Sequence, residues 1–251
     1  MEVDAALLIA ALPAVMLAGL SKGGFGSAFG MLATPVLALA VPPVQAAAIM
    51  LPLLLAGDAV GLLSWRGKVR WSVIAHTLPG AVAGIATGWA TAAYVDDNLI
   101  RGAVGAIALT FGIQQYLADR LRRPGRNESA PRGGFWGFLA GYTSFVSHAG
   151  GPPFQAYVLP LKMDKELLSG TTVMFFSVVN AIKVAPYFLL GQFDARNLSV
   201  SALLLPAAIA AAIAGVWLVR RSPQALVYNA AYLALVAVGA KLIADSIAAS
   251  L

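Results

Sequence analysis

The chain has 251 residues, of which 59% are hydrophobic and only 11% are charged. Soluble globular domains carry about 25% charged residues, so this composition excludes an ordinary soluble domain and indicates a membrane protein with several spans. Cysteine is absent, which excludes disulfides and thiolate metal sites.

The N-terminal residues MEVD are acidic, unlike the basic start of a cleaved signal peptide, so the first apolar run is expected to be retained. A membrane span requires about 20 mostly apolar residues, because the hydrocarbon core is about 30 Å thick. Six segments meet this length, in chain order 45–64, 72–94, 99–117, 168–190, 198–219 and 225–247.

Shorter apolar segments flank two glycine-rich breaks. Segments 4–20 and 26–40 lie on either side of SKGGFG, and segments 133–146 and 152–161 lie on either side of SHAGGPP. Irregular backbone is tolerated at membrane depth only where protein or a water-filled cavity satisfies its polar groups. The breaks therefore predict broken or re-entrant helix hairpins.

The two halves of the chain resemble each other at an offset that stays between 124 and 127 residues. Lys22 aligns with His148, and the Gly-Gly pair that follows Lys22 aligns with Gly150 and Gly151. So small a drift over both halves indicates a duplicated unit. We expect an N-terminal transmembrane repeat over 1–118, a basic linker over 119–132 and a C-terminal repeat over 133–251.

The net charge of +6 gathers in short loops between apolar runs, which is typical of membrane topology signals and argues against nucleic-acid binding. Placing basic loops 65–71, 118–132 and 220–223 in the cytoplasm leaves both termini outside. Each repeat then crosses an odd number of times, so the repeats are inverted. The predicted fold is an all-α polytopic membrane protein of two inverted repeats, each with about five hydrophobic segments.

Lys22 and His148 are expected at equivalent positions on the tips of the two hairpins, near the bilayer centre. Glycines allow a ligand to approach the backbone, and the helix N-termini that follow carry partial positive charge, so a small anion suits this arrangement. The alternatives are a loop lysine that reaches the headgroups and a structural histidine.

Asp58 and Lys183 are charges within predicted spans, where charged side chains are functional candidates by default. Lys183 would add positive charge for an anion and Asp58 would take part in ion coupling; a structural ion pair is the alternative for both. Trp65, Trp71 and Tyr94 lie at span ends and are interpreted as membrane-interface anchors.

The blocks KGGFGSAFGMLATP, PVQAAAIMLP, SHAGGPPFQAYVLP and GTTVMFFSVVN resemble the TauE/SafE family of sulfite exporters, also called the toluene-sulfonate uptake permease family. The resemblance covers nearly the whole chain and implies a multi-pass carrier of the bacterial cytoplasmic membrane. Its substrates would be small sulfur-containing or organic anions such as sulfite, sulfoacetate or other sulfonates. Pro35 and Pro152 also fall within the glycine-rich signatures of the family.

The predicted function is secondary transport of such an anion by alternating access, coupled to a proton or sodium ion; an anion channel is the alternative. An enzyme is not expected, because the chain has only two histidines and no nucleophile or zinc-protease motif. No cofactor, metal or nucleic acid is expected, and the lipid bilayer is the surrounding partner. The predicted substrate-binding residues are Lys22, Gly23, Gly24, Phe25, Gly26, His148, Gly150, Gly151, Gln155, Asn180 and Lys183.

Overall fold

The computed structural model describes residues 5–24, 30, 33–34, 36–37, 40–41, 43–91, 97–121, 124–191 and 193–249. The regular elements of these residues are helices, as the composition and the apolar runs predict. They are α1 (Ala5–Lys22), α3 (Pro43–Ser64), α4 (Trp71–Thr91), α5 (Asp97–Arg120), α6 (Ala130–Ser147), α7 (Gly151–Val158), η1 (Leu159–Leu161), α8 (Lys165–Leu189), α9 (Ala195–Arg221) and α10 (Gln224–Ala248).

Five of the six predicted spans coincide with helices that are long and apolar enough to cross a membrane, namely α3, α4, α8, α9 and α10. The remaining predicted span, 99–117, lies within the 24-residue helix α5. α1 is apolar but shorter. Phe25, Gly26, Pro35 and Tyr94 lie outside the described residues, as does most of segment 26–40.

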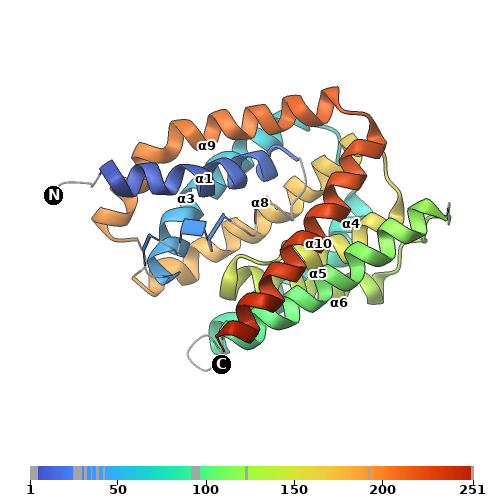
Figure 1. Cartoon of the computed structure of the whole chain (residues 1–251), viewed down its shortest axis with the longest axis horizontal. Helices are drawn as coiled ribbons and strands as arrows, with labels where there is room; N and C mark the ends of the chain where they lie inside the picture. The colour runs from blue at the N-terminus through green and yellow to red at the C-terminus, as the bar shows by residue number, and fades with distance from the viewer. Residues whose placement is uncertain are drawn as a thin grey trace.

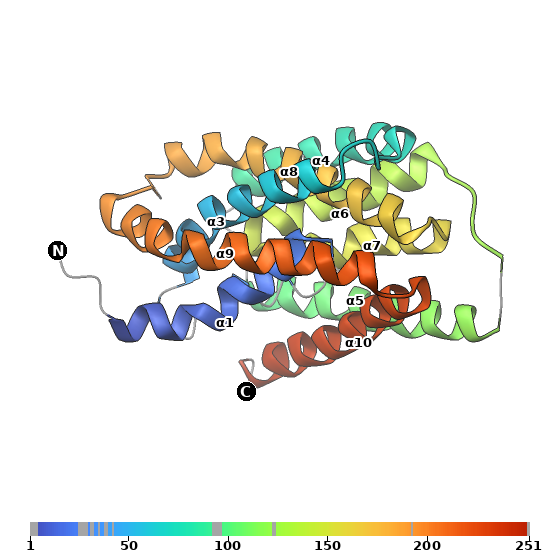
Figure 2. The same ribbon diagram turned by 90° about the horizontal axis from the view of Figure 1, so that it is seen from above.

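Helices from the two halves of the chain pack on each other rather than only within their own half. α1 lies along α9, α4 along α6, and α5 along α10 (Figures 1 and 2). α3 also contacts both α8 and α9. α1 of the first half thus packs on α9 of the second half, and α6 of the second half packs on α4 of the first.

Glycines allow these helix pairs to approach at the level of the backbone. A Cβ added to Gly23 of α1 would lie 2.4 Å from the carbonyl oxygen of Ala212 in α9. A Cβ added to Gly84 of α4 would lie 2.1 Å from the carbonyl oxygen of Phe138 in α6. Small residues at such contacts are the usual means of packing helices in membranes, where apolar side chains gain little by leaving lipid.

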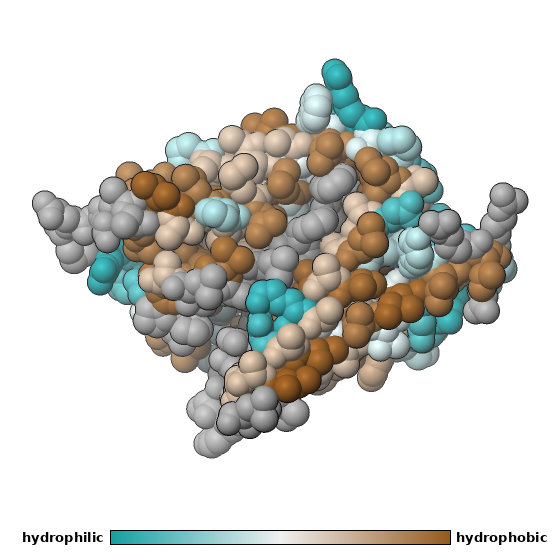
Figure 3. Space-filling view, in the orientation of Figure 1, coloured by the Kyte–Doolittle hydropathy of each residue, from teal (hydrophilic) through white to brown (hydrophobic). Residues whose placement is uncertain are grey.

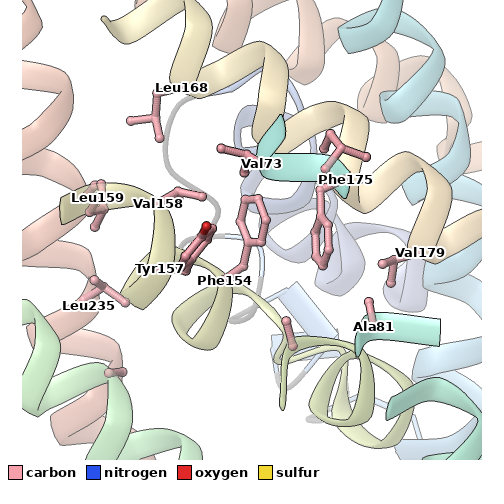
Figure 4. Packing of buried hydrophobic residues seen from close by; sticks show 14 of the residues in the cluster. Val73, Ala81, Phe154, Tyr157, Val158, Leu159, Leu168, Phe175, Val179 and Leu235 are labelled. Carbon is pink, nitrogen blue, oxygen red and sulfur yellow. The ribbon is translucent and has the colours of Figure 1, made fainter. Parts of the chain in front are cut away.

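Large apolar side chains cover much of the outer surface, as expected of a lipid-facing protein. In Figure 3 brown residues run along α5 and α10 at the lower right. Leu117 of α5 and Leu233 of α10 are both exposed. The interior core is also apolar, and Phe154 of α7 stacks on Phe175 of α8 with ring centroids 4.1 Å apart (Figure 4).

The basic loops meet at one end of the molecule. Lys68 forms an ion pair with Glu166 at 3.0 Å, and Arg70 forms one with Glu128. Lys165 Nζ donates to the carbonyl oxygen of Arg220 at 2.9 Å. Loops 65–70, 124–129, 162–164 and 220–223 therefore share one end, as the charge pattern predicts.

The opposite end is identified by a contact between the starts of α3 and α9, where Gln45 Nε2 donates to Asn197 Oδ1 at 3.0 Å.

The segment from α6 through η1 does not run from one end of the molecule to the other, unlike these long helices. Arg126 N–H, before α6, donates to the carbonyl oxygen of Pro160 in η1 at 2.7 Å. This segment therefore begins and ends at the same end of the molecule.

The backbone contact at Gly84 predicts a large effect from one added methyl group. Gly84→Ala places its Cβ within 2.1 Å of Phe138 O, so α4 and α6 must separate, and overpacking of this kind costs about 1–3 kcal/mol. We expect the thermal midpoint in detergent to fall. Gly134→Ala in α6 is the matched control, because its nearest neighbour would be His76 O at 4.0 Å. An equal loss in both variants would contradict this account.

The arrangement of the ends predicts the labelling pattern of single cysteines introduced into this cysteine-free chain. Asn127→Cys and Gln224→Cys, both at exposed positions, should resist an impermeant thiol reagent in intact cells, because their ends are expected in the cytoplasm. Ala195→Cys, at the opposite end, should be labelled. Different labelling of positions 127 and 224 would contradict the shared end, and labelling of both without position 195 would reverse the orientation.

Candidate functional site

The first glycine-rich break is held by side chains from α8 and from the end of α3. α1 ends at Lys22, and Gly24 has φ 101°, a left-handed conformation that favours glycine. The carbonyl oxygen of Gly23 accepts a hydrogen bond of 2.9 Å from Trp65 Nε1. The carbonyl oxygen of Gly24 accepts one of 3.1 Å from Ser169 Oγ. The unwound backbone thus finds protein donors, as buried carbonyl groups require.

The interpretation of Trp65 as a membrane-interface anchor is wrong. Its side chain is only 2% exposed, and its indole N–H is used by the backbone of the first break. Trp71, interpreted in the same way, is 62% exposed. A tryptophan at the end of an apolar run suits either role, because the ring is apolar and its N–H needs one polar partner.

Lys22 belongs to a buried network with two residues from other helices. Its Nζ lies 2.7 Å from Asp58 Oδ1 of α3, and Asp58 Oδ2 accepts a hydrogen bond of 2.7 Å from Asn180 Nδ2 of α8. Lys22 Nζ also lies 5.6 Å from the ring centroid of Phe176. Both carboxylate oxygens accept from donors, which is the arrangement of an ionised aspartate. The charges of Lys22 and Asp58 therefore compensate each other.

The second break places His148 in a matching network. His148 is left-handed, with φ 53°, and its Nδ1 lies 3.1 Å from Nζ of Lys183. Lys183 is fully buried and also donates to the carbonyl oxygen and hydroxyl of Ser144, at 3.1 and 3.2 Å. His148 Nε2 lies 3.0 Å from the hydroxyl of Tyr187. Among the described residues no carboxylate forms an ion pair with Lys183.

The two networks border the same small cavity. Its volume is about 50 Å³, and because one water needs about 10–15 Å³ it has room for a few waters or one anion of four or five heavy atoms. It brings together residues of both glycine-rich breaks. The lining residues are Ser21, Lys22, Gly30, Leu54, Ser144, His148, Gly151, Thr172, Val173, Phe176 and Asn180.

The other predicted residues are distributed differently. Asp58 and Lys183 are not lining residues. Asp58 is hydrogen-bonded to the lining residues Lys22 and Asn180, and Lys183 to the lining residues Ser144 and His148. Gly23 faces the backbone of α9, Gly24 faces Ser169 and Trp65, and Gly150 faces the carbonyl oxygen of Ala140. These three glycines pack against protein and are not among the lining residues. Gln155 is buried in α7 and is also not a lining residue.

The helix N-terminus at the second break offers few donors to an anion. α7 begins at Gly151, and the next two residues, Pro152 and Pro153, have no backbone N–H. The carbonyl oxygen of Gly150 already accepts from the N–H of Phe154. Positive charge at this cavity therefore comes mainly from lysine side chains rather than from helix ends.

The structure adds Ser144, Thr172 and Phe176 to the predicted set. Thr172, Phe176, Asn180 and Lys183 follow each other at intervals of four, four and three residues, so they lie on one face of α8. Ser144 lies four residues before His148, one helical turn away. The sequence signal for Thr172 and Phe176 was their helical spacing from Asn180 and Lys183, and the signal for Ser144 was its spacing of one turn from His148.

Comparison with known proteins gives one match. The family model described as Sulfite exporter TauE/SafE matches residues 11–242, which include both glycine-rich breaks and the four residues Lys22, Asp58, His148 and Lys183. No curated protein and no solved structure matches the chain.

The contact between Trp65 and the first break predicts that its indole N–H stabilises the fold. Trp65→Phe keeps an aromatic ring but leaves the buried carbonyl group of Gly23 without a side-chain donor, and such a group costs about 1–3 kcal/mol. We expect a lower thermal midpoint in detergent. Trp71→Phe is the control, because Trp71 is mostly exposed. Equal midpoints for the Trp65 variant and the wild type would show that the hydrogen bond contributes nothing.

Proposed function

The chain belongs to the TauE/SafE sulfite exporter family, a family of membrane transporters, and on that premise we propose that it carries a small sulfur-containing or organic anion through the central cavity. The substrate class is that of sulfite, sulfoacetate and other sulfonates. The proposed mechanism is alternating access, in which the cavity opens to one side of the membrane at a time. The proposed location is the bacterial cytoplasmic membrane.

One observation carries the proposal: the two glycine-rich breaks, about 125 residues apart in the chain, contribute to a single small cavity. Lys22 lines this cavity, and Lys183 is bound to two of its lining residues, Ser144 and His148. Intramembrane charges are costly and are retained where they serve substrate or ion pathways. An anion is the ligand that such a cavity favours. Asn180, Thr172 and Ser144 add hydrogen-bonding groups beside it.

Inverted repeats are the architecture that we propose for this carrier. In the proposed repeat, α1 corresponds to α6 and α4 corresponds to α9. The α1–α9 contact and the α6–α4 contact are then equivalent, which supports a two-fold relation between the halves. The segment 130–161 returns to the end where it began, which supports a re-entrant hairpin. Secondary transporters commonly place their substrate site between two such repeats near the bilayer midplane. The proposed repeats are 1–118 and 133–251, joined by the linker 119–132.

Ion coupling through Asp58 is part of the proposal. Its carboxylate is held by Lys22 and Asn180, so a proton on Asp58 would break the ion pair and release the ammonium of Lys22 toward an anion. Binding of the proton and of the anion would then be coupled. The proton frees the ammonium of Lys22 for the anion, and the anion replaces the carboxylate as the partner of Lys22. Asp58→Asn should therefore bind an anion but lose uphill transport.

Transport by proteoliposomes tests the proposal. Liposomes preloaded with unlabelled sulfonate should take up labelled sulfonate faster than empty ones, because a carrier exchanges substrate across the membrane whereas a channel shows no such acceleration. Lys183→Met should abolish uptake, since it removes the cavity's uncompensated cation. Lys241→Met, which alters an exposed lysine paired with Asp245, is the matched control and should transport normally. Uptake that shows no exchange acceleration would indicate a channel.

A further inference from the structure

The charge of the cavity can be counted from its contacts. Lys22 and Asp58 form an ion pair of 2.7 Å and contribute no net charge. Lys183, fully buried, is bound by Ser144 and His148 and by no carboxylate among the described side chains. With Lys183 protonated, one positive charge is left without an opposite charge within ion-pairing distance.

His148 does not add a second positive charge in this arrangement. An ammonium can only donate, so Nδ1 of His148 accepts from Lys183 and carries no proton. The proton of a neutral imidazole is then on Nε2, which donates to the hydroxyl of Tyr187 at 3.0 Å. The hydroxyl of Tyr187 in turn donates to the carbonyl oxygen of Phe145. Among the residues that the structure describes, Lys22, Asp58, His148 and Tyr187 are the ionisable groups around Lys183, and together with protonated Lys183 they carry one net positive charge.

A buried site discriminates strongly between ligands of different charge, because charges interact more strongly at low dielectric than in water. A singly charged anion leaves the site neutral, whereas a doubly charged anion leaves an uncompensated negative charge in a span. Leu54, Val173 and Phe176 give the cavity an apolar side as well. On the basis of the proposed function, we infer that this site selects singly charged anions with a small apolar group, such as short alkanesulfonates, over doubly charged anions of the same size. Within the proposed substrate class, the inference disfavours sulfoacetate, which carries both a sulfonate and a carboxylate.

Methanesulfonate and sulfate are the probes that test this inference. Both are tetrahedral, and they differ in a methyl group against an oxygen and in one unit of charge. Binding to the purified protein at mildly acidic pH, which keeps Lys183 protonated, is measured by calorimetry and should favour methanesulfonate by at least about tenfold. Equal or tighter binding of sulfate would overturn the inference.

A series of variants separates the charge rule from a preference for the methyl group. Asp58→Asn raises the net charge of the site to two and should shift the preference toward sulfate by about tenfold or more. Combining it with Lys22→Met returns the net charge to one and should restore the preference for methanesulfonate. A preference that is the same in the single and the double variant would contradict the rule.

Lys22→Met alone provides a further measurement if Asp58→Asn does not fold. It leaves Asp58 and Lys183 as the charged groups, so the net charge is zero and both anions should bind more weakly than to the wild type. Wild-type affinity in this variant would also contradict the rule. Binding of neither anion to the wild type rejects the anion site of the proposed function and this inference with it, whereas tight binding of sulfate rejects only the charge rule.

Discussion

A charged side chain in the hydrocarbon region has to be compensated, and this constraint organises the centre of the molecule. Lys22 meets it through Asp58, and Asn180 satisfies the second oxygen of that carboxylate. Lys183 meets it only partly, through a hydroxyl, a carbonyl oxygen and an imidazole nitrogen. These contacts join α1 to α3 and α6 to α8, so the polar centre also sets which helices lie side by side.

The positions that the predicted repeat aligns have different charges in the two halves. Lys22 and His148 occupy one pair of equivalent positions, and Asp58 and Lys183 lie 125 residues apart, within the offset range of the repeat. In the first half the lysine is the last residue of α1 and the acid is on α3. In the second half a histidine follows α6 and a lysine is on α8, so neither position carries an acid. The proposed two-fold scaffold would therefore enclose an asymmetric charge distribution.

Much of the fold could be predicted from hydropathy, because the bilayer imposes a length on every span. Five of the predicted spans match helices within a few residues, and the clustering of the basic loops was also predicted. The roles of the glycines were not predictable from sequence. Close helix packing and ligand approach both require a missing side chain, and only the neighbours of Gly23 and Gly24 distinguish the two. Trp65 was misassigned because the partner of its N–H, the carbonyl of Gly23, lies 42 residues away.

The backbone contacts of α1 with α9 and of α4 with α6 have a mechanical consequence. Helices that touch through glycine backbones have no layer of side chains between them. Each pair is therefore expected to move as one rigid unit. Lys22 belongs to the α1–α9 pair and Ser144 to the α4–α6 pair, whereas Asp58 and Lys183 are on α3 and α8, between these pairs. A tilt of one pair against the other would strain the Lys22–Asp58 and Lys183–Ser144 contacts. In the proposed alternating access, the bonds that hold the charges would therefore also resist the change of conformation.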